Sequence, residues 1–115
     1  MQKFQVKIEL NGAKAIVTMI GDVTHECENN MMEAYEKITA QKARNILLDF
    51  SQVDYINSAG MSVIITLLTK SQNAEQKLNA CGLSQHFLKI FDMVGLLKYI
   101  PHFDTRSEGV QNLEN

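Results

Sequence analysis

Tryptophan is absent from this sequence of 115 residues, proline occurs once and cysteine only twice. The two cysteines, Cys27 and Cys81, form neither a CxxC pair nor a zinc-binding spacing, and the three histidines are equally dispersed. The sequence also contains no Gly-rich phosphate loop and no G-x-S-x-G motif. We therefore expect no bound metal and no cofactor, and we expect both cysteines to be buried, reduced thiols.

Long apolar runs and an excess of positive charge are missing as well. No run approaches the roughly 20 apolar residues that cross a bilayer, and residues 1–10 alternate polar and apolar side chains, unlike a signal peptide. The 11 Lys and Arg residues are scattered, and 13 Asp and Glu residues give a net charge of −2. A nucleic-acid binder needs a concentrated basic face. We therefore expect a cytoplasmic protein that binds neither a membrane nor nucleic acid directly.

Apolar and polar side chains alternate at the start of the chain. Residues 4–10 place apolar side chains at every second position, which predicts a half-buried strand. The pair Asn11-Gly12 follows and favours a tight hairpin, because both residue types tolerate positive φ. Residues 13–20 then predict the returning strand, which Gly21 is expected to end.

Helical spacing replaces this pattern in the middle of the chain. Residues 24–41 carry apolar side chains at helical spacing, with acidic residues at the start and basic residues after the end, as the helix dipole favours. The apolar run NILLDF, residues 45–50, predicts a central strand covered on both faces. A second helix begins near Ser58. Its buried stripe is expected to consist of Met61, Ile64, Ile65 and Leu68.

The last third of the chain repeats this alternation. Residues 77–82 predict a short strand, and Ser84 caps a further helix. Residues 96–100 predict a weak last strand, stopped by the single proline, and a helix follows at 106–114. The order of elements predicts a single α/β domain over residues 1–115, with a mixed β-sheet of four to five strands covered by about four helices.

The stretch DYINSAGMS joins the central strand to the second helix. Asn57 and Ser58 are both residue types that cap helices, so either one could satisfy free backbone N–H groups, which is worth about 1 kcal/mol. Capping does not explain Gly60, because glycine in a helix costs up to about 1 kcal/mol relative to alanine. We interpret Gly60 as room for the close approach of a partner protein. Solvated loop carboxylates are expected at Asp49 and Asp54.

Several stretches carry a family resemblance. The central motif of the STAS domain family resembles ILLDFSQVDYINSAGMSVIITLL, residues 46–68, and the family's last helix and following turn are similar to FLKIFDMVGLLKYI, residues 87–100. The hairpin and the segment GDVTHE, residues 21–26, stand where the family has its opening strands and the loop into its first helix. The resemblance covers nearly the whole chain. A free-standing domain of this length looks like an anti-sigma factor antagonist, the best-known single-domain member of the family.

The resemblance implies phosphorylation at Ser58, since the family modifies the hydroxyl residue that directly follows an acid. Asn57 stands here in place of that acid, and Ala59 replaces a frequent second Ser or Thr, which leaves a single acceptor. The resemblance and the small side chains together predict a partner-binding surface. Its expected residues are Asp22, Thr24, Asn57, Ser58, Ala59, Gly60, Met61 and Ser62. Capping of the first helix is the alternative role for Asp22 and Thr24.

The function that the resemblance implies is partner switching. The unphosphorylated protein is expected to bind an anti-sigma factor with serine kinase activity and to release it once Ser58 is phosphorylated, and a serine phosphatase resets the switch. The protein would then be a substrate and not an enzyme. A second hypothesis is a STAS scaffold subunit of a lipid transporter or signalling complex that is never phosphorylated. A nucleophilic Ser58 would need a base within hydrogen-bond reach, and no nearby His or Lys in the sequence suggests one.

Overall fold

A five-stranded sheet in the order β1-β2-β3-β4-β5 is the frame of the computed structural model, which describes residues 3–113. The strands are β1 (Gln5–Asn11), β2 (Lys14–Val23), β3 (Asn45–Ile56), β4 (Lys77–Cys81) and β5 (His102–Phe103). β1 is antiparallel to β2, and the other neighbours are parallel. The predicted mixed sheet is therefore confirmed, and helical segments connect its parallel strands.

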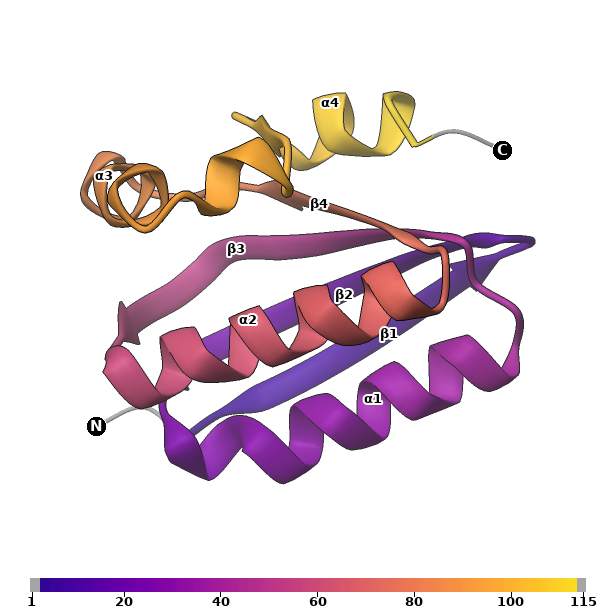
Figure 1. The fold of residues 1–115 in the computed structure, drawn as a ribbon, viewed down its shortest axis with the longest axis horizontal. Coiled ribbons are helices and arrows are strands. Elements are labelled where there is room, and N and C mark those ends of the chain that lie inside the picture. Colours follow the sequence, from indigo (N-terminus) through magenta and orange to yellow (C-terminus); the bar gives the residue numbers. More distant parts are fainter. Residues whose placement is uncertain (1–2, 114–115) are drawn as a thin grey trace.

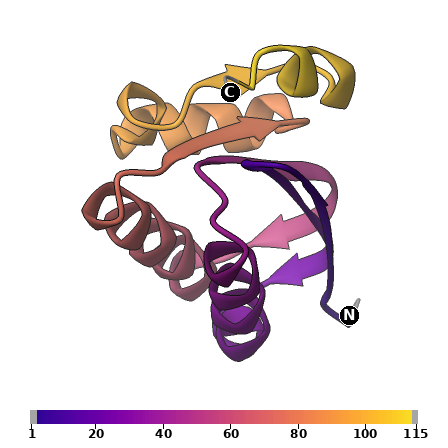
Figure 2. The same ribbon diagram turned by 90° about the vertical axis from the view of Figure 1, so that its right-hand side faces the viewer.

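Helices follow the strands in the predicted order. In the described part of the chain they are α1 (Glu28–Ala40), α2 (Ser58–Asn73), α3 (Gln85–Met93) and α4 (Arg106–Gln111), with two short 3-10 helices, η1 (His25–Cys27) and η2 (Leu96–Lys98). α1 and α2 lie side by side on one face of the sheet (Figure 1). α3 and α4 lie beyond β4, on the side away from α1 and α2 (Figure 2). Within residues 3–113 no helix combines the length and the apolar character that a bilayer crossing requires.

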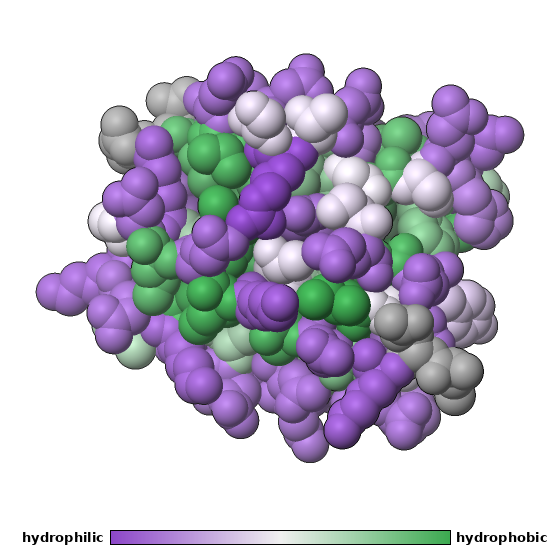
Figure 3. Space-filling view, turned by 180° about the vertical axis from the view of Figure 1, so that it is seen from behind, coloured by the Kyte–Doolittle hydropathy of each residue, from purple (hydrophilic) through white to green (hydrophobic). Residues whose placement is uncertain are grey.

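The core has two parts because β3 is buried on both faces, as its apolar run predicts. Leu48 and Phe50 belong to the larger core, which α1 and α2 cover, and Leu47 lies in a smaller core under α4. Phe50 packs edge-on against Phe91 of α3, with ring centroids 5.5 Å apart. Cys27 and Cys81 are buried and free, which confirms the sequence prediction. On the back of the molecule, hydrophilic side chains interrupt the apolar surface (Figure 3).

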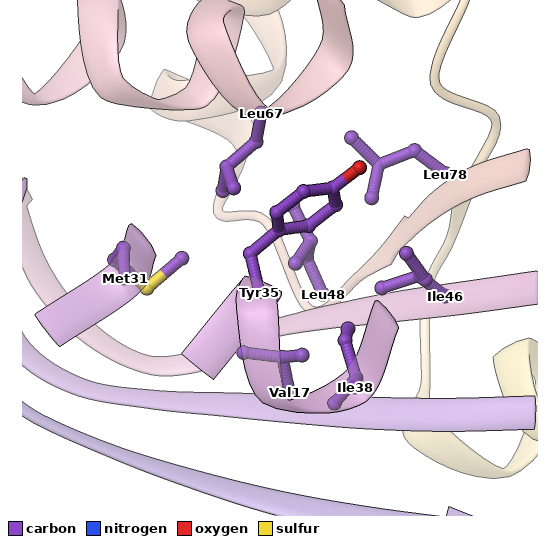
Figure 4. Close-up of a pocket in the computed structure, with 8 residues that line it drawn as sticks. All are labelled: Val17, Met31, Tyr35, Ile38, Ile46, Leu48, Leu67 and Leu78. Atoms are coloured by element: carbon purple, nitrogen blue, oxygen red, sulfur yellow. The ribbon is translucent and has the colours of Figure 1, made fainter. Parts of the chain in front are cut away.

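A small void remains in the larger core, between α1, α2 and the sheet. Apolar side chains surround it, and the ring of Tyr35 lies between α1 and α2 beside Leu67 (Figure 4). Its volume of about 10 Å³ is room for one water molecule at most. The hydroxyl of Tyr35 points away from the void and donates a hydrogen bond to Gln76 Oε1 at 2.7 Å. This void is a packing defect and is too small for a ligand.

Several predicted elements differ from the structure in extent or type. The last helix, predicted over residues 106–114, ends at Gln111, and residue 114 lies outside the described residues. The hairpin is confirmed, but its second strand continues through Gly21, which has φ +99°, as far as Val23. β3 also runs on to Ile56, so Asp54 lies in an exposed strand and not in a loop. Residues 96–100 form a helical turn rather than a strand, and β5 follows Pro101. Leu96 and Ile100 are both buried at helical spacing, which the sequence could not separate from a short apolar strand.

A partly buried ion pair fastens α4 to the sheet, and it contradicts the expected solvation of Asp49. Asp49 is only 2% exposed and accepts hydrogen bonds from the backbone and hydroxyl of Ser51 and from Arg106 Nη1 at 3.0 Å. Arg106 also donates to Thr18 and contacts Glu9. Burial opposes ionisation of Asp49, but the hydrogen bonds from Ser51 and Arg106 outweigh it and lower the pKa of the carboxyl.

Arg106→Met should lower the free energy of unfolding by about 2 kcal/mol at pH 7, because Asp49 would lose its charged hydrogen-bond partner. The folded-state pKa of Asp49 is lowered, so its stabilising effect is present above the usual carboxyl pKa and is lost as the pH falls through the folded value. Urea unfolding at pH 7 and pH 3 measures both effects. Arg44→Met, at an exposed loop position, is the control, and an equal loss in the two variants would contradict the assigned role.

His102 gives the fold a second dependence on pH. Its Nε2 accepts the backbone N–H of Leu83 at 3.1 Å, and burial lowers the pKa of the ring, although Asp104 opposes the shift. Because the folded pKa is lowered, the stabilisation is complete above the unfolded pKa of roughly 6.5 and is lost as the pH falls through the folded value. His102→Gln keeps an acceptor but cannot titrate, so its unfolding free energy should change less than that of the wild type between pH 7 and pH 5.

Candidate functional site

Ser58 is the first residue of α2, where the chain leaves β3 (Figure 1). Asn57 precedes it in extended conformation, and its Oδ1 accepts the N–H of Gly60 at 2.8 Å. Asn57 is therefore the helix cap, and the capping role that was open to Ser58 is not used. Ser58 is exposed, and its hydroxyl forms no hydrogen bond within residues 3–113. The side chain is thus free to react without loss of a cap.

The first turn of α2 offers free backbone donors next to this hydroxyl. Met61 N–H bonds to the carbonyl of Asn57 at 2.8 Å, whereas the N–H groups of Ser58 and Ala59 have no partner in the described part of the chain. No acidic residue lies in this turn. Free N–H groups and the positive end of the helix dipole favour an anion at this position. The turn can therefore accommodate negative charge on Ser58.

Gly60 has a different role from the predicted one. The residue is buried, and a Cβ atom at this position would lie 1.9 Å from the carbonyl oxygen of Val23. The same carbonyl accepts the N–H of Asn57 at 3.2 Å. Glycine is thus required by the close approach of α2 to the end of β2. The interpretation of Gly60 as room for a partner was wrong, and Met61, which is 9% exposed, also points into the core.

The loop before α1 lies beside the start of α2. Asp22 pairs with Tyr55 at the ends of β2 and β3, so the following residues emerge next to Asn57. Thr24 is buried, and its Oγ1 accepts the N–H of Glu26 at 3.3 Å, which makes it the cap of η1. Asp22 is half-buried and does not cap. Asp22 and Thr24 therefore border the site. Thr24 also caps the helical turn that leads into α1, which was the alternative role for these residues.

One residue of the exposed surface was missed. Ile65 was expected in the buried stripe of α2, but it is 43% exposed, and Val63 and Leu67 are buried in addition to the other predicted members. Ile65 shares its helix flank with Ser58, Ser62 and Thr69, which lie seven residues before, three before and four after it. The polar residues at these helical spacings were the feature of the sequence that could have placed Ile65 on the exposed side of α2. The hydroxyls on this flank turn back onto helix carbonyls. Their bonds join Ser62 to Ser58, Thr66 to Ser62 and Thr69 to Ile65.

The exposed part of the site is thus small and nearly uncharged. It consists of Ser58, Ser62 and Ile65, which are exposed, with Asn57, Ala59 and Asp22 half-buried at its border. Within residues 3–113 no group of three or more His, Cys, Asp or Glu side chains is placed to hold a metal ion. Such a surface presents one free hydroxyl group and offers few charges to a partner.

The model of the STAS domain family matches residues 5–109 of the chain. The chain belongs to the STAS domain family. An anti-sigma F factor antagonist of Paenibacillus polymyxa is 22% identical over 111 residues, which cover 96% of this chain and 95% of that protein. The sequence resemblance to the family is therefore confirmed.

Solved structures share the fold of this STAS domain. An anti-sigma factor antagonist from Mycobacterium paratuberculosis superposes with a TM-score of 0.83, at 15% identity and with 98% of this chain and 96% of that chain covered. The Bacillus cell fate determinant SpoIIAA in its phosphorylated form gives a TM-score of 0.73 at 14% identity, with 95% and 97% covered. At these identities the likeness establishes the α/β STAS fold.

Proposed function

We propose that this STAS domain is a cytoplasmic anti-sigma factor antagonist whose binding is switched by phosphorylation of Ser58. The unphosphorylated protein binds an anti-sigma factor that is also a serine kinase, and this frees the sigma factor. The kinase transfers a phosphoryl group from ATP to Ser58, and a serine phosphatase removes it later. The observation that carries the proposal is the free, exposed hydroxyl of Ser58 at the start of α2.

Phosphoryl transfer makes the protein a substrate and not a catalyst. Ser58 Oγ forms a bond to the γ-phosphorus of ATP, ADP leaves, and the hydroxyl proton passes to a base of the kinase. No described side chain bonds to the Ser58 hydroxyl, so the kinase has to supply that base. Asn57 keeps its bond to Gly60, since the cap does not involve Ser58. The reaction therefore needs no rearrangement of α2.

The phosphorylated domain remains folded for electrostatic reasons. A phosphoryl group brings about −1.5 to −2 charges at pH 7. The free N–H groups of Ser58 and Ala59 and the helix dipole favour this charge. Asn57, which replaces the acid of the family pattern, adds no carboxylate that would repel the phosphate. The modification is thus compatible with the fold, and its effect is on the affinity for the partner.

A docked partner, in contrast, cannot accept the charge. A protein surface packed over Ser58, Ala59 and Ser62 would bury the phosphate without a counter-charge, which costs several kcal/mol. Each 1.4 kcal/mol reduces the affinity tenfold, so the modification is sufficient to dissociate the complex. Steric overlap of the added group with the partner acts in the same direction. The switch therefore operates through charge and bulk at the surface around Ser58.

Two differences from the family pattern, Asn57 and Ala59, favour a second candidate function. A scaffold subunit of a lipid transporter or signalling complex would use the same surface without phosphorylation, and it needs neither the acid nor a second hydroxyl. The two functions differ in the proteins that the domain captures from its native lysate. A histidine-kinase-like ATPase supports the switch, and a transporter ATPase supports the scaffold.

Ser58→Ala should accept no phosphoryl group from the captured kinase and should stay bound to it in the presence of ATP. Its melting temperature should remain close to that of the wild type, because Asn57 provides the cap. Thr69→Ala is the control, since Thr69 is an exposed hydroxyl residue about three turns further along α2, and it should be phosphorylated as the wild type is. Intact-mass spectrometry measures the transfer. Phosphorylation of Ser58→Ala at the wild-type rate would place the acceptor elsewhere.

A further inference from the structure

The outer edge of β1 is unpaired in the described part of the chain. β1 is the first strand of the sheet order and pairs only with β2. Its hairpin has a two-residue loop, because Asn11 pairs with Lys14. Counted back from this pair, alternate residues of β1 bond to β2, and the backbone groups of Val6, Ile8 and Leu10 face outward. An open edge of this kind is a template for another strand.

A groove of about 480 Å³ follows this edge between β1 and α1. Residues 5–8 line it from the strand, and Asn30, Glu33, Ala34 and Lys37 line it from the helix. The apolar residues on the helix side of β1 are incompletely covered, since Val6 and Ile8 are half-buried and Leu10 is 41% exposed. The groove therefore has both free backbone groups and apolar surface to offer to an added strand.

A second copy of β1 fits the charges of this edge in one antiparallel register. When a two-fold axis passes through Ile8, Lys7 of each copy lies opposite Glu9 of the other, and Val6 lies opposite Leu10. Moving the axis by one residue brings Lys7 opposite Lys7 or Glu9 opposite Glu9, and like charges at opposite positions destabilise a sheet. The order Lys-Ile-Glu is self-complementary, so charge makes a second copy a suitable occupant and favours this register over the two that are shifted by one residue.

We propose that the chain forms a two-fold symmetric homodimer in which β1 pairs with β1 of a second copy and joins the two sheets. The outward backbone groups of Val6, Ile8 and Leu10 form the new hydrogen bonds. Residues directly opposite each other share a face of the sheet, so the apolar side chains of the second strand enter the groove beside α1. Glu9 contacts Arg106 through Oε2, which leaves Oε1 for Lys7 of the second copy.

Sedimentation equilibrium on the full chain tests this dimer by exchanging its charges. The wild type should dimerise, and Lys7→Glu or Glu9→Lys should each weaken dimerisation roughly tenfold or more, because both cross-strand pairs become repulsive. An equimolar mixture of the two variants should dimerise again, since opposite charges then meet at every pair. Lys89→Glu on the exposed surface of α3 makes the same change in net charge as Lys7→Glu and should leave the dimer intact.

A cysteine at the axis tests the register. Ile8→Cys should form a disulfide between copies on mild oxidation, because residues of a hydrogen-bonded pair have Cα atoms about 5.5 Å apart. Val6→Cys should not, since position 6 lies opposite position 10. A wild type that stays monomeric at every concentration, or a dimer that Lys7→Glu leaves unchanged, would overturn the proposal. None of these residues belongs to the Ser58 site, so either result leaves the proposed switch untouched.

Discussion

Gly60→Ala should lower the free energy of unfolding by about 3 kcal/mol or more, because the added methyl group would overlap the backbone of Val23. The added Cβ would lie only 1.9 Å from a carbonyl oxygen, which cannot rotate away as the end of a side chain could. At an unconstrained helix position the same change stabilises, by up to about 1 kcal/mol. The sign of the effect therefore tests the close packing of α2 against β2, and urea unfolding measures it.

The matched control for this variant is Ser62→Ala, which lies two residues further along the same helix and is exposed. Its unfolding free energy should differ from that of the wild type by only about 0.5 kcal/mol. An unchanged stability of Gly60→Ala would show that α2 can move away from Val23 at little cost. Bulky substitutions at Gly60 thus test folding, and they give no information on partner binding.

Ser58→Asp should weaken binding of the anti-sigma kinase at least about tenfold while the domain remains folded, because the interface must desolvate the new carboxylate. The melting temperature should not fall, since an acidic side chain in the first turn of a helix is favoured by about 0.3–1 kcal/mol. True phosphorylation should weaken binding further, because the phosphate carries more charge and bulk. Isothermal titration calorimetry against the purified kinase, beside a thermal melt, separates lost binding from lost folding.

Thr69→Asp provides the control for charge alone. Thr69 is exposed on the same flank of α2, about three turns beyond Ser58, so the added charge has the same sign at a distant place. This variant should bind the kinase nearly as the wild type does. Equal affinities for Ser58→Asp, Thr69→Asp and the wild type would mean that the partner docks away from the start of α2.

Local chemistry made much of this fold predictable. The starts of helices depend on side chains within three residues, and Thr24, Asn57 and Ser84 all accept the backbone N–H groups that their types predict. The alternation in residues 4–10 and the apolar run at the start of β3 likewise identified a half-buried strand and a central strand. The exposure of Ser58 followed from its place in the first turn.

Long-range contacts explain what the sequence could not predict. Asp49 is buried because Arg106, 57 residues later, bonds to it, and no pattern around Asp49 indicates that partner. Gly60 is required by Val23, on a strand far away in the sequence, so its local cost was assigned to a partner protein instead. Ile65 lies between the buried face and the polar face of α2, and only the packing of the helix decides whether such a residue is buried or exposed.

The central claim is that Ser58 carries a phosphoryl group in the cell. Intact-mass spectrometry of the protein isolated from its native cells, followed by fragmentation of the peptide that contains Ser58, tests it most directly. We predict two forms that differ by one phosphoryl group, with the group on Ser58 and with phosphatase treatment leaving a single form. A protein that is always unmodified, under conditions that both activate and silence its sigma factor, would contradict the switch and favour the scaffold.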